Sequence, residues 1–313
     1  MAAPGFWTRP PGRLLRLVGP LAPGVRRRSR PAAKAEVPVV AVGSASLWGT
    51  GKTPAVIALA QRLAARGRAV HVVTRGAGPA FRVDERGHAA AEVGDEPLLI
   101  AAFAPTWVAA RPADGVGAAA AAGAEIVVLD GGWPDSAVVA DVTIAVEDAV
   151  RGFGNGYAWP LGPLKRRIRD AFGDVDHLLT VGPAAAQHAF SARWAADVPC
   201  PRLAAELVPL QTGMDWSGLD VVAFAGIGAP ERFFATLAGL GATLIRAQAL
   251  SDHQEMTPAL LGRLEAEARR AGAQLVTTEK DAVRLPPGFR PKVVSLPVRL
   301  EPADWAPLDA LLP

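Results

Sequence analysis

One stretch of the chain has the residue types and the spacing of a phosphate-binding loop. It is the segment Ser46-Leu47-Trp48-Gly49-Thr50-Gly51-Lys52-Thr53, which lies between the apolar run 39–43 and a helical pattern over 55–66. Glycines let the backbone turn its amides toward phosphate oxygens, and the start of a helix adds partial positive charge. We expect Lys52 to reach the β- and γ-phosphates of a nucleotide and the Thr53 hydroxyl to bind Mg²⁺.

The match to the pattern G-x-x-x-x-G-K-[ST] is incomplete, because Ser46 stands at the position of the first glycine. A Gly-Lys-Thr triplet alone is common, but one between a strand and a helix favours a nucleotide-binding loop over a plain turn. The apolar run 126–129 ends in Asp130. At the carboxyl end of a strand, Asp130 would lie near Mg²⁺ and Thr53. Strands often end in Asp, so this second pattern indicates a metal site only in combination with the phosphate-binding loop.

The elements around these residues predict the fold class. Short apolar runs alternate with helical patterns, first to about residue 183 and again after about residue 205. Such alternation predicts parallel sheets. We therefore expect an α/β fold with a P-loop NTPase-like parallel sheet flanked by helices and a second, smaller α/β domain. The expected organisation is an N-terminal arm over 1–34, a nucleotide-binding domain over 35–190 and a C-terminal domain over 191–313.

Composition excludes several classes of protein. Half of the 313 residues are hydrophobic, so a sizeable core can form. The single cysteine, Cys200, excludes an intramolecular disulfide framework and a cysteine-based metal cluster. Residues 1–34 carry a charge of +8; since the whole chain carries +3, residues 35–313 carry −5. The basic character thus belongs to the arm, and a nucleic-acid partner is not expected.

The basic arm also contains apolar residues, including Phe6, Trp7 and the stretch 14–18, followed by an arginine cluster over 26–30. No apolar run approaches the roughly 20 residues of a membrane span. One interpretation is an interfacial anchor, in which apolar side chains enter the headgroup region and arginines meet anionic lipid. A disordered basic arm and an organelle-targeting peptide are the alternatives.

Taken together, these features resemble the bacterial tetraacyldisaccharide 4'-kinase family across nearly the whole chain. The matching stretches are, in chain order, Gly49-Thr50-Gly51-Lys52-Thr53-Pro54, Arg75-Gly76, Val93-Gly94-Asp95-Glu96-Pro97, Leu129-Asp130, Arg151-Gly152-Phe153-Gly154-Asn155-Gly156, Pro160-Leu161-Gly162-Pro163-Leu164, Phe224-Ala225-Gly226-Ile227-Gly228, Pro230-Glu231-Arg232-Phe233-Phe234, Asp252-His253 and Val276-Thr277-Thr278-Glu279-Lys280-Asp281-Ala282-Val283. Gly-Asp-Glu-Pro and Thr-Thr-Glu-Lys-Asp-Ala are the most specific of them.

The resemblance implies a kinase that uses ATP and Mg²⁺ to phosphorylate the 4'-hydroxyl of tetraacyldisaccharide 1-phosphate, a lipid A precursor. It further implies a peripheral or monotopic position at the cytoplasmic face of the bacterial inner membrane. Lys52 would act on the nucleotide, while Asp95 deprotonates the sugar hydroxyl and His253 orients Asp95 or tunes its pKa. From the residues alone, Asp95 and Glu96 could instead cap a helix, and His253 could be a surface histidine.

Three further side chains are candidates for substrate binding: Arg75, Glu96 and Arg151. Arg75 would approach a phosphate or only end a strand, and Arg151 would contact the lipid phosphate or form a salt bridge within its loop. Lys280 and Asp281 could be no more than a surface ion pair, which stabilises little.

The chain departs from the family pattern near the expected metal. The family has a second Asp where Gly131 stands and a glycine where Trp48 stands, and Pro134 falls where Gln is usual. Losing a carboxylate there would weaken Mg²⁺ binding. A catalytically impaired paralogue that binds nucleotide or lipid is therefore an alternative. A different phosphate-loop enzyme is a third, although the Asn-Lys-x-Asp motif of a GTPase is absent from the sequence.

Overall fold

The protein is described from a computed structural model, which places residues 4–25, 33–134, 137–251 and 254–313. The chain forms two compact units. The first contains Met1–Asp84, Ile100–Leu207 and Leu300–Pro313; the second contains Glu85–Leu99 and Val208–Arg299. This division differs from the boundary expected at 190/191, because two strands beyond residue 190, Arg202–Pro209 and Val298–Pro302, belong to the first sheet.

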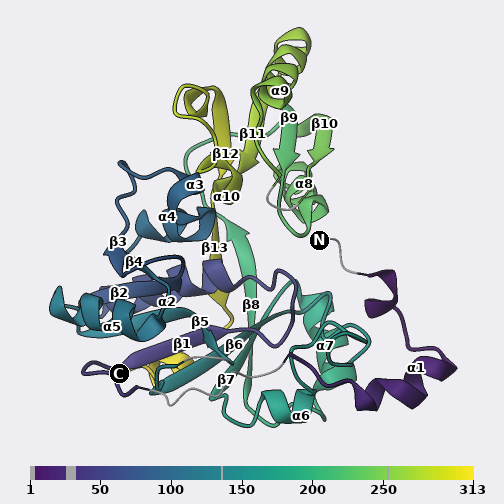
Figure 1. Ribbon diagram of the computed structural model, residues 1–313. Helices are drawn as coiled ribbons and strands as arrows, with labels where there is room; N and C mark the ends of the chain where they lie inside the picture. Colours follow the sequence, from purple (N-terminus) through teal and green to yellow (C-terminus); the bar gives the residue numbers. More distant parts are fainter. Residues whose placement is uncertain (1–3, 26–32, 135–136, 252–253) are drawn as a thin grey trace. The chain divides into compact units, whose positions relative to one another are not determined.

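The first unit is built on a nine-stranded sheet with the order β13-β8-β7-β6-β1-β5-β2-β4-β3 (Figure 1). Its strands are β1 (Val39–Gly43), β2 (Val70–Arg75), β3 (Phe81–Arg82), β4 (Thr106–Ala109), β5 (Ile126–Trp133), β6 (Val142–Asp148), β7 (His177–Val181), β8 (Arg202–Pro209) and β13 (Val298–Pro302). The strands from β8 to β4 pair in parallel, and β3 pairs antiparallel to β4. This confirms the expected α/β class with a mostly parallel sheet.

The central strands are apolar on both sides, as expected for strands covered by helices on both faces. Every residue of β1 is buried. Helix α2 packs on β1, β2, β5 and β6, while α5 packs on β2, β4 and β5. The helices that belong wholly to this unit are α1 (Arg13–Val18), α2 (Lys52–Ala65), α5 (Pro112–Ala121), α6 (Ile168–Ala171), α7 (Ala184–Trp194) and α11 (Ala306–Asp309), with the short 3-10 helices η1 (Gly5–Trp7) and η2 (Gly19–Leu21).

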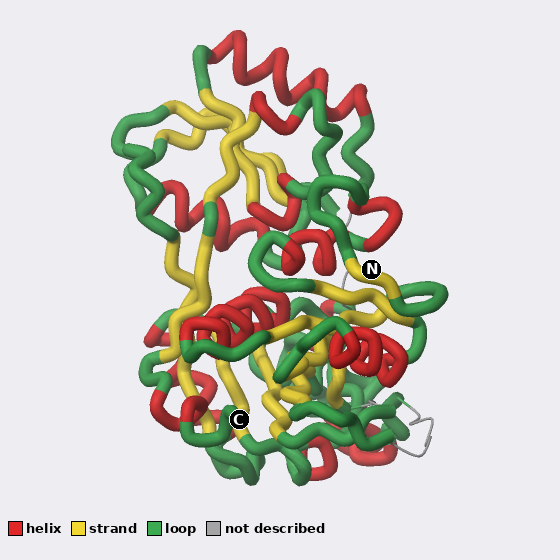
Figure 2. Tube along the Cα trace, turned by 90° about the vertical axis from the view of Figure 1, so that its left-hand side faces the viewer, coloured by secondary structure: helices red, strands yellow, loops and turns green. Residues whose placement is uncertain are grey.

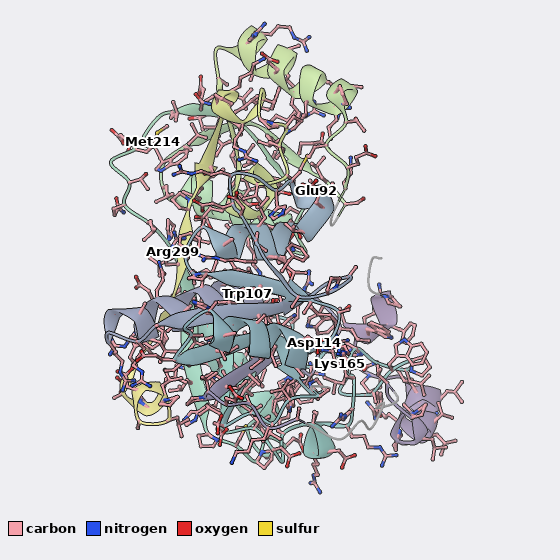
Figure 3. All side chains as sticks on the ribbon, turned by 60° about the vertical axis from the view of Figure 1, so that its left-hand side comes forward. Glu92, Trp107, Asp114, Lys165, Met214 and Arg299 are labelled. Atoms are coloured by element: carbon pink, nitrogen blue, oxygen red, sulfur yellow. The ribbon has the colours of Figure 1, made fainter. Side chains whose placement is uncertain are left out.

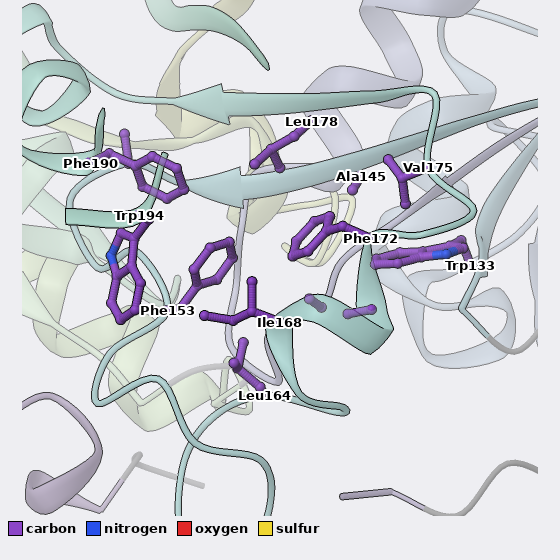
Figure 4. Close-up of a cluster of buried hydrophobic side chains, with 13 residues drawn as sticks. Trp133, Ala145, Phe153, Leu164, Ile168, Phe172, Val175, Leu178, Phe190 and Trp194 are labelled. Atoms are coloured by element: carbon purple, nitrogen blue, oxygen red, sulfur yellow. The ribbon is translucent and has the colours of Figure 1, made fainter. Parts of the chain in front are cut away.

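An aromatic cluster fixes the long loop that follows β6. The Phe153 ring lies among Phe172, Phe190 and Trp194, at centroid distances of 5.4, 5.3 and 5.3 Å (Figure 4). Phe153 itself is fully buried. The segment 151–165 therefore has a fixed place beside β6, and it holds the phosphate loop described below.

The N-terminal arm runs against this same segment. The Trp7 indole Nε1 donates to the Pro160 carbonyl over 3.2 Å, and the Asn155 amide donates to the Trp7 carbonyl over 2.7 Å. Helix α1 has no buried residue, and its Leu14 and Leu17 are 74% and 75% exposed. None of the helices in the described part of the chain has both the length and the apolar composition that a transmembrane span requires.

The second unit has a parallel four-stranded sheet with the order β10-β9-β11-β12 (Figure 2, strands in yellow). Its elements are α3 (Ala90–Val93), β9 (Asp220–Ala225), α8 (Pro230–Gly239), β10 (Thr243–Ala249), α9 (Pro258–Ala271), β11 (Gln274–Thr278), α10 (Glu279–Ala282), η3 (Arg290–Lys292) and β12 (Val293–Leu296). Helix α4 (Asp95–Ala101) begins in this unit. The Thr257 hydroxyl caps α9 by accepting from the Leu260 amide, and Gly272, with φ of 62°, ends it.

Candidate active site

The phosphate loop joins the buried strand β1 to α2, the arrangement expected from the sequence. Gly51 has φ of 90°, a left-handed conformation that favours glycine, and Lys52 is the first residue of the helix. No side chain of the described residues caps α2. The amides of its first turn are therefore free of side-chain acceptors, and amides so placed bind anions readily. An anion at the start of α2 would therefore have no side-chain cap to displace.

Thr53 and Asp130 are positioned by neighbouring elements of this unit. Asp130 lies in β5, which pairs with β1 so that Val42 stands opposite Asp130. Asp130 is thus level with the end of β1, where the phosphate loop begins, and it is 9% exposed. Thr53 lies in the first turn of α2 and is 8% exposed. A carboxylate and a hydroxyl on adjoining elements are oxygen donors suited to Mg²⁺.

Gly131, where the family has its second Asp, follows directly. Its φ is 70°, and a Cβ atom placed on it would meet no atom within 4 Å. Among the described residues, no group of three or more His, Cys, Asp or Glu side chains could hold a metal ion. Asp130 itself lies inside β5 and not at its carboxyl end as predicted, because the strand continues through Gly131 to Trp133.

A buried glutamate holds the first residues of the loop. Glu147 lies in β6 and is fully buried. Its Oε1 atom accepts from the Ala45 amide over 2.5 Å and from the Ser46 amide over 3.1 Å. Its Oε2 atom accepts from the Ser46 hydroxyl over 2.5 Å. Burial raises the pKa of Glu147 to about 7, against these hydrogen bonds and the nearby Lys165 charge, which lower it.

The same residues are held from the other side by the segment 151–165. The Lys165 ammonium donates to the Ser44 carbonyl over 2.8 Å. The Lys165 side chain is labelled in Figure 3. The Lys165 amide donates to the Ala45 carbonyl over 2.7 Å, and the Leu47 amide donates to the Pro163 carbonyl over 2.9 Å. Residues 44–47, which precede the glycines of the loop, are thus held both by Glu147 and by the segment 151–165.

Trp48 is 9% exposed and packs into this segment. A Cβ atom on Gly154 would lie 2.8 Å from the indole Cη2 atom and 3.0 Å from Pro163 Cγ. The close approach of ring and backbone explains the need for a glycine at Gly154, whose φ is 59°. The Trp48 side chain is therefore buried against the segment 151–165, next to the loop.

The second unit carries its own cluster of expected residues. Asp95 and Glu96 are the first residues of α4, and the Glu96 amide donates to Asp95 Oδ1 over 2.9 Å. The Lys280 ammonium lies 3.0 Å from Glu96 Oε1 and 3.9 Å from Asp95 Oδ2. Lys280 thus pairs with Asp95 and Glu96. Asp281 has other partners.

Asp281 is fully buried and organises the loops around it. Its Oδ2 atom accepts from the Gly226 amide over 2.9 Å and from the Thr278 hydroxyl over 2.8 Å. The Arg284 guanidinium lies 3.2 Å from Oδ1 and also donates to the Gln254 carbonyl. The interpretation of Lys280 and Asp281 as a surface ion pair is therefore wrong, because each has a different partner and Asp281 is in the interior.

The remaining expected residues have separate positions. Arg75 is the exposed last residue of β2. The Arg151 guanidinium lies 4.0 Å from Asp148 Oδ2. This contact is the local salt bridge that was one of the two alternatives for Arg151. His253 lies outside the described residues.

Sequence reasoning missed Glu147 and Lys165. Strand β6 continues beyond its apolar run 142–146 through Glu147 and Asp148. Charged residues directly after an apolar run in a central strand were the available signal, since a buried carboxylate requires hydrogen-bond partners.

Comparisons with known proteins agree with this arrangement. The family model described as LpxK, tetraacyldisaccharide-1-P 4'-kinase, matches residues 17–313. A tetraacyldisaccharide 4'-kinase of Jannaschia sp. (strain CCS1) is 49% identical over 320 residues, which cover 99% of this chain and 98% of the relative. One of Dinoroseobacter shibae is 51% identical over 331 residues, which cover 100% and 98%. The crystal structure of the "apo" form of LpxK from Aquifex aeolicus in complex with ATP covers 90% of this chain and 89% of its own, with a TM-score of 0.69 and 20% identity, and supports the fold.

Proposed function

Because this chain belongs to the tetraacyldisaccharide 4'-kinase family, we propose that it transfers the γ-phosphate of ATP to the 4'-hydroxyl of tetraacyldisaccharide 1-phosphate. It is thus a phosphotransferase whose acceptor is an alcohol group of a lipid A precursor. The observation that carries the proposal within the chain is the phosphate loop, in which left-handed Gly51 leads into the uncapped start of α2.

The loop would bind the phosphates of ATP through the backbone amides at the start of α2. Lys52 would neutralise charge on the β- and γ-phosphates while the phosphoryl group moves to the acceptor oxygen. Such transfer depends on positioning and on neutralising charge rather than on covalent chemistry by the protein. The fixed start of the loop, held by Glu147 and Lys165, supports this role because a preorganised loop needs no rearrangement during the reaction.

Thr53 and Asp130 would hold Mg²⁺. The fit rests on the donor types, a hydroxyl and a carboxylate on adjoining elements of one unit. A bound Mg²⁺ would neutralise phosphate charge and orient the transferred group. One carboxylate is compatible with Mg²⁺, which commonly keeps several waters and takes further oxygens from substrate phosphates. Gly131 therefore does not by itself exclude metal binding.

Asp95 would accept the proton of the 4'-hydroxyl as that oxygen bonds to the γ-phosphorus and the bond to the departing ADP breaks. Its position in the first turn of α4, with the Lys280 ammonium 3.9 Å from its Oδ2 atom, supports this role. Glu96, paired with the same lysine, and the arginines Arg75 and Arg151 are candidates for contacts to the acceptor. His253 is proposed as the partner of Asp95 on the family resemblance alone.

The N-terminal arm would place the enzyme on the membrane that contains its acceptor. Leu14 and Leu17 are exposed on α1, and the arm is rich in arginine. Exposed leucines beside basic residues suit the headgroup region of an anionic leaflet. We propose a peripheral position at the cytoplasmic face of the inner membrane, where ATP is present.

The proposal is tested by transfer of radiolabelled γ-phosphate from ATP to tetraacyldisaccharide 1-phosphate in detergent micelles, with Mg²⁺ or with excess chelator. We expect labelled lipid only with the metal, and a loss of about a hundredfold or more in kcat/KM for Lys52→Ala, since charge-stabilising groups contribute about 3 kcal/mol or more. Lys292→Ala is the matched control, because that lysine pairs with Glu265 on the surface of the second unit. Equal activity in both lysine variants would contradict the role of the loop. Tight ATP binding without any lipid product would instead indicate an impaired paralogue.

A further inference from the structure

We infer that Glu147 is a positioning residue for ATP binding, which acts by bracing the first residues of the phosphate loop. The inference rests on the proposed function, because it assumes that the loop binds the phosphates of ATP. Glu147 is not expected to touch the nucleotide; it acts through Ala45 and Ser46.

The geometry of the brace is specific to a carboxylate-shaped side chain. One oxygen accepts both backbone amides, and the other accepts the Ser46 hydroxyl. The backbone amides of Ala45 and Ser46 share one acceptor on β6, so both must point toward that strand. The chain is therefore turned at Ser46, where the phosphate-loop pattern has its first glycine. The hydrogen bonds to Glu147 thus select one backbone conformation at Ser46. A flexible glycine at this position would not select one by itself.

The opposite side of the loop shows that Glu147 is part of a two-sided clamp. Lys165 holds the Ser44 carbonyl, and Pro163 accepts from the Leu47 amide. Lys165 is also the charged group that acts on the Glu147 carboxylate. If Glu147 is removed, the amides of Ala45 and Ser46 lose their acceptor while the contacts to 163–165 persist. The loop is then held from one side only, and several backbone conformations become accessible.

The test compares Glu147→Val, Glu147→Gln and the wild type in the full chain, by the KM for ATP, the KM for the lipid acceptor and kcat. Valine suits a buried strand but accepts no hydrogen bond. We expect Glu147→Val to raise the KM for ATP by about tenfold or more, with the KM for the acceptor within about twofold of wild type. Glutamine can place its carbonyl on the two amides and its NH2 group on the Ser46 oxygen. We therefore expect Glu147→Gln to restore the wild-type KM for ATP to within about threefold.

Thr180→Val is the matched control. Thr180 is fully buried in β7, the strand beside β6, and its hydroxyl donates to Gln187 Oε1 over 2.7 Å. This change also removes a buried hydrogen bond from the same sheet, but not one to the phosphate loop. We expect a loss of stability with an unchanged KM for ATP. If Glu147→Val does not fold, Glu147→Asp replaces it, since the shorter side chain cannot span both amides and the hydroxyl.

Three results would overturn the inference: an unchanged KM for ATP in Glu147→Val, an equal rise in Thr180→Val, or no rescue by glutamine. The Lys52→Ala variant distinguishes a failure of the Glu147 inference from a failure of the proposed function. Full loss of activity in Lys52→Ala with an unaffected Glu147→Val would refute the brace alone. Full activity in Lys52→Ala would refute ATP binding by the loop.

Discussion

The ring of Trp48 lies directly against Gly154, so that a Cβ atom on the glycine would stand 2.8 Å from the indole. The same Cβ atom would also lie 2.4 Å from the Trp7 carbonyl oxygen. One glycine thus allows the phosphate loop, the 151–165 segment and the N-terminal arm to meet. This packing explains the glycine at position 154, because no larger residue leaves room for both neighbours.

We predict that Gly154→Ala destabilises the protein by about 3 kcal/mol, through overpacking and left-handed strain. Gly123→Ala is the control, because Gly123 has φ of 93° and a Cβ atom added to it would meet no atom within 4 Å. That variant should lose about 1 kcal/mol, from strain alone. Urea denaturation of the three proteins measures the difference. Equal losses of stability in Gly154→Ala and Gly123→Ala would show that the Trp48 ring and the Trp7 carbonyl move aside without a loss of stability.

Glu147 makes stability depend on pH. Burial raises its pKa from 4.5 to about 7, so the folded state holds a proton that the unfolded state releases. The stability that this gives is fully present below about pH 4.5 and is lost as the pH rises through about 7. The shift corresponds to about 3 kcal/mol at most.

The free energy of unfolding of wild type and Glu147→Gln, measured by urea at pH 5 and pH 8, checks this prediction. Glutamine does not titrate, whereas all other groups are common to both proteins. The wild type should therefore lose stability relative to Glu147→Gln as the pH rises. A constant difference between the two proteins would mean that Glu147 keeps the same protonation in the folded and unfolded states.

Asp281 is predicted to stabilise the second unit. Asp281→Ala leaves the Arg284 guanidinium and the Gly226 amide without this acceptor, and breaking a buried pair from one side costs about 3–5 kcal/mol. Lys292→Met removes an exposed ion pair with Glu265 and should cost less than about 1 kcal/mol. Thermal unfolding of both variants gives the comparison. A small loss for Asp281→Ala would mean that the loops reorganise around the arginine.

The exposed leucines of α1 are predicted to bind lipid. The double variant Leu14→Glu, Leu17→Glu should lower sedimentation with vesicles of anionic phospholipid by about tenfold, while stability changes by less than about 0.5 kcal/mol. Ile245→Glu is the control, since Ile245 is an exposed apolar residue of the second unit at 47%. Unchanged vesicle binding in the leucine variant would exclude α1 as the membrane contact.

Much of the fold could be predicted from local pattern. The apolar run 39–43, the helical pattern over 55–66 and the strand–helix alternation all correspond to observed elements, because apolar spacing is a local signal. The return of β13 to the first sheet and the membership of 85–99 in the second unit were not predicted. Both depend on pairing between residues far apart in the chain, which periodicity does not encode.

The site divides in the same way. Lys52 and Thr53 lie in the first turn of a helix, as the loop pattern predicted, whereas Asp130 lies inside β5 and not at its carboxyl end. Glu147 was missed because its role depends on the neighbouring strand β1 and on the loop that follows it. Likewise, the burial of Trp48 follows from Gly154, more than a hundred residues later in the chain, so its effect on the loop could not be deduced from its size.

The most direct test of the central claim is the chemical identity of the product. Wild-type protein, Mg²⁺, ATP and tetraacyldisaccharide 1-phosphate are incubated, and the lipid is analysed by mass spectrometry and phosphorus NMR. We expect one added phosphate, located on the 4'-oxygen, with one ADP formed for each lipid. Release of inorganic phosphate with unmodified lipid, or a phosphate at another position, would contradict it.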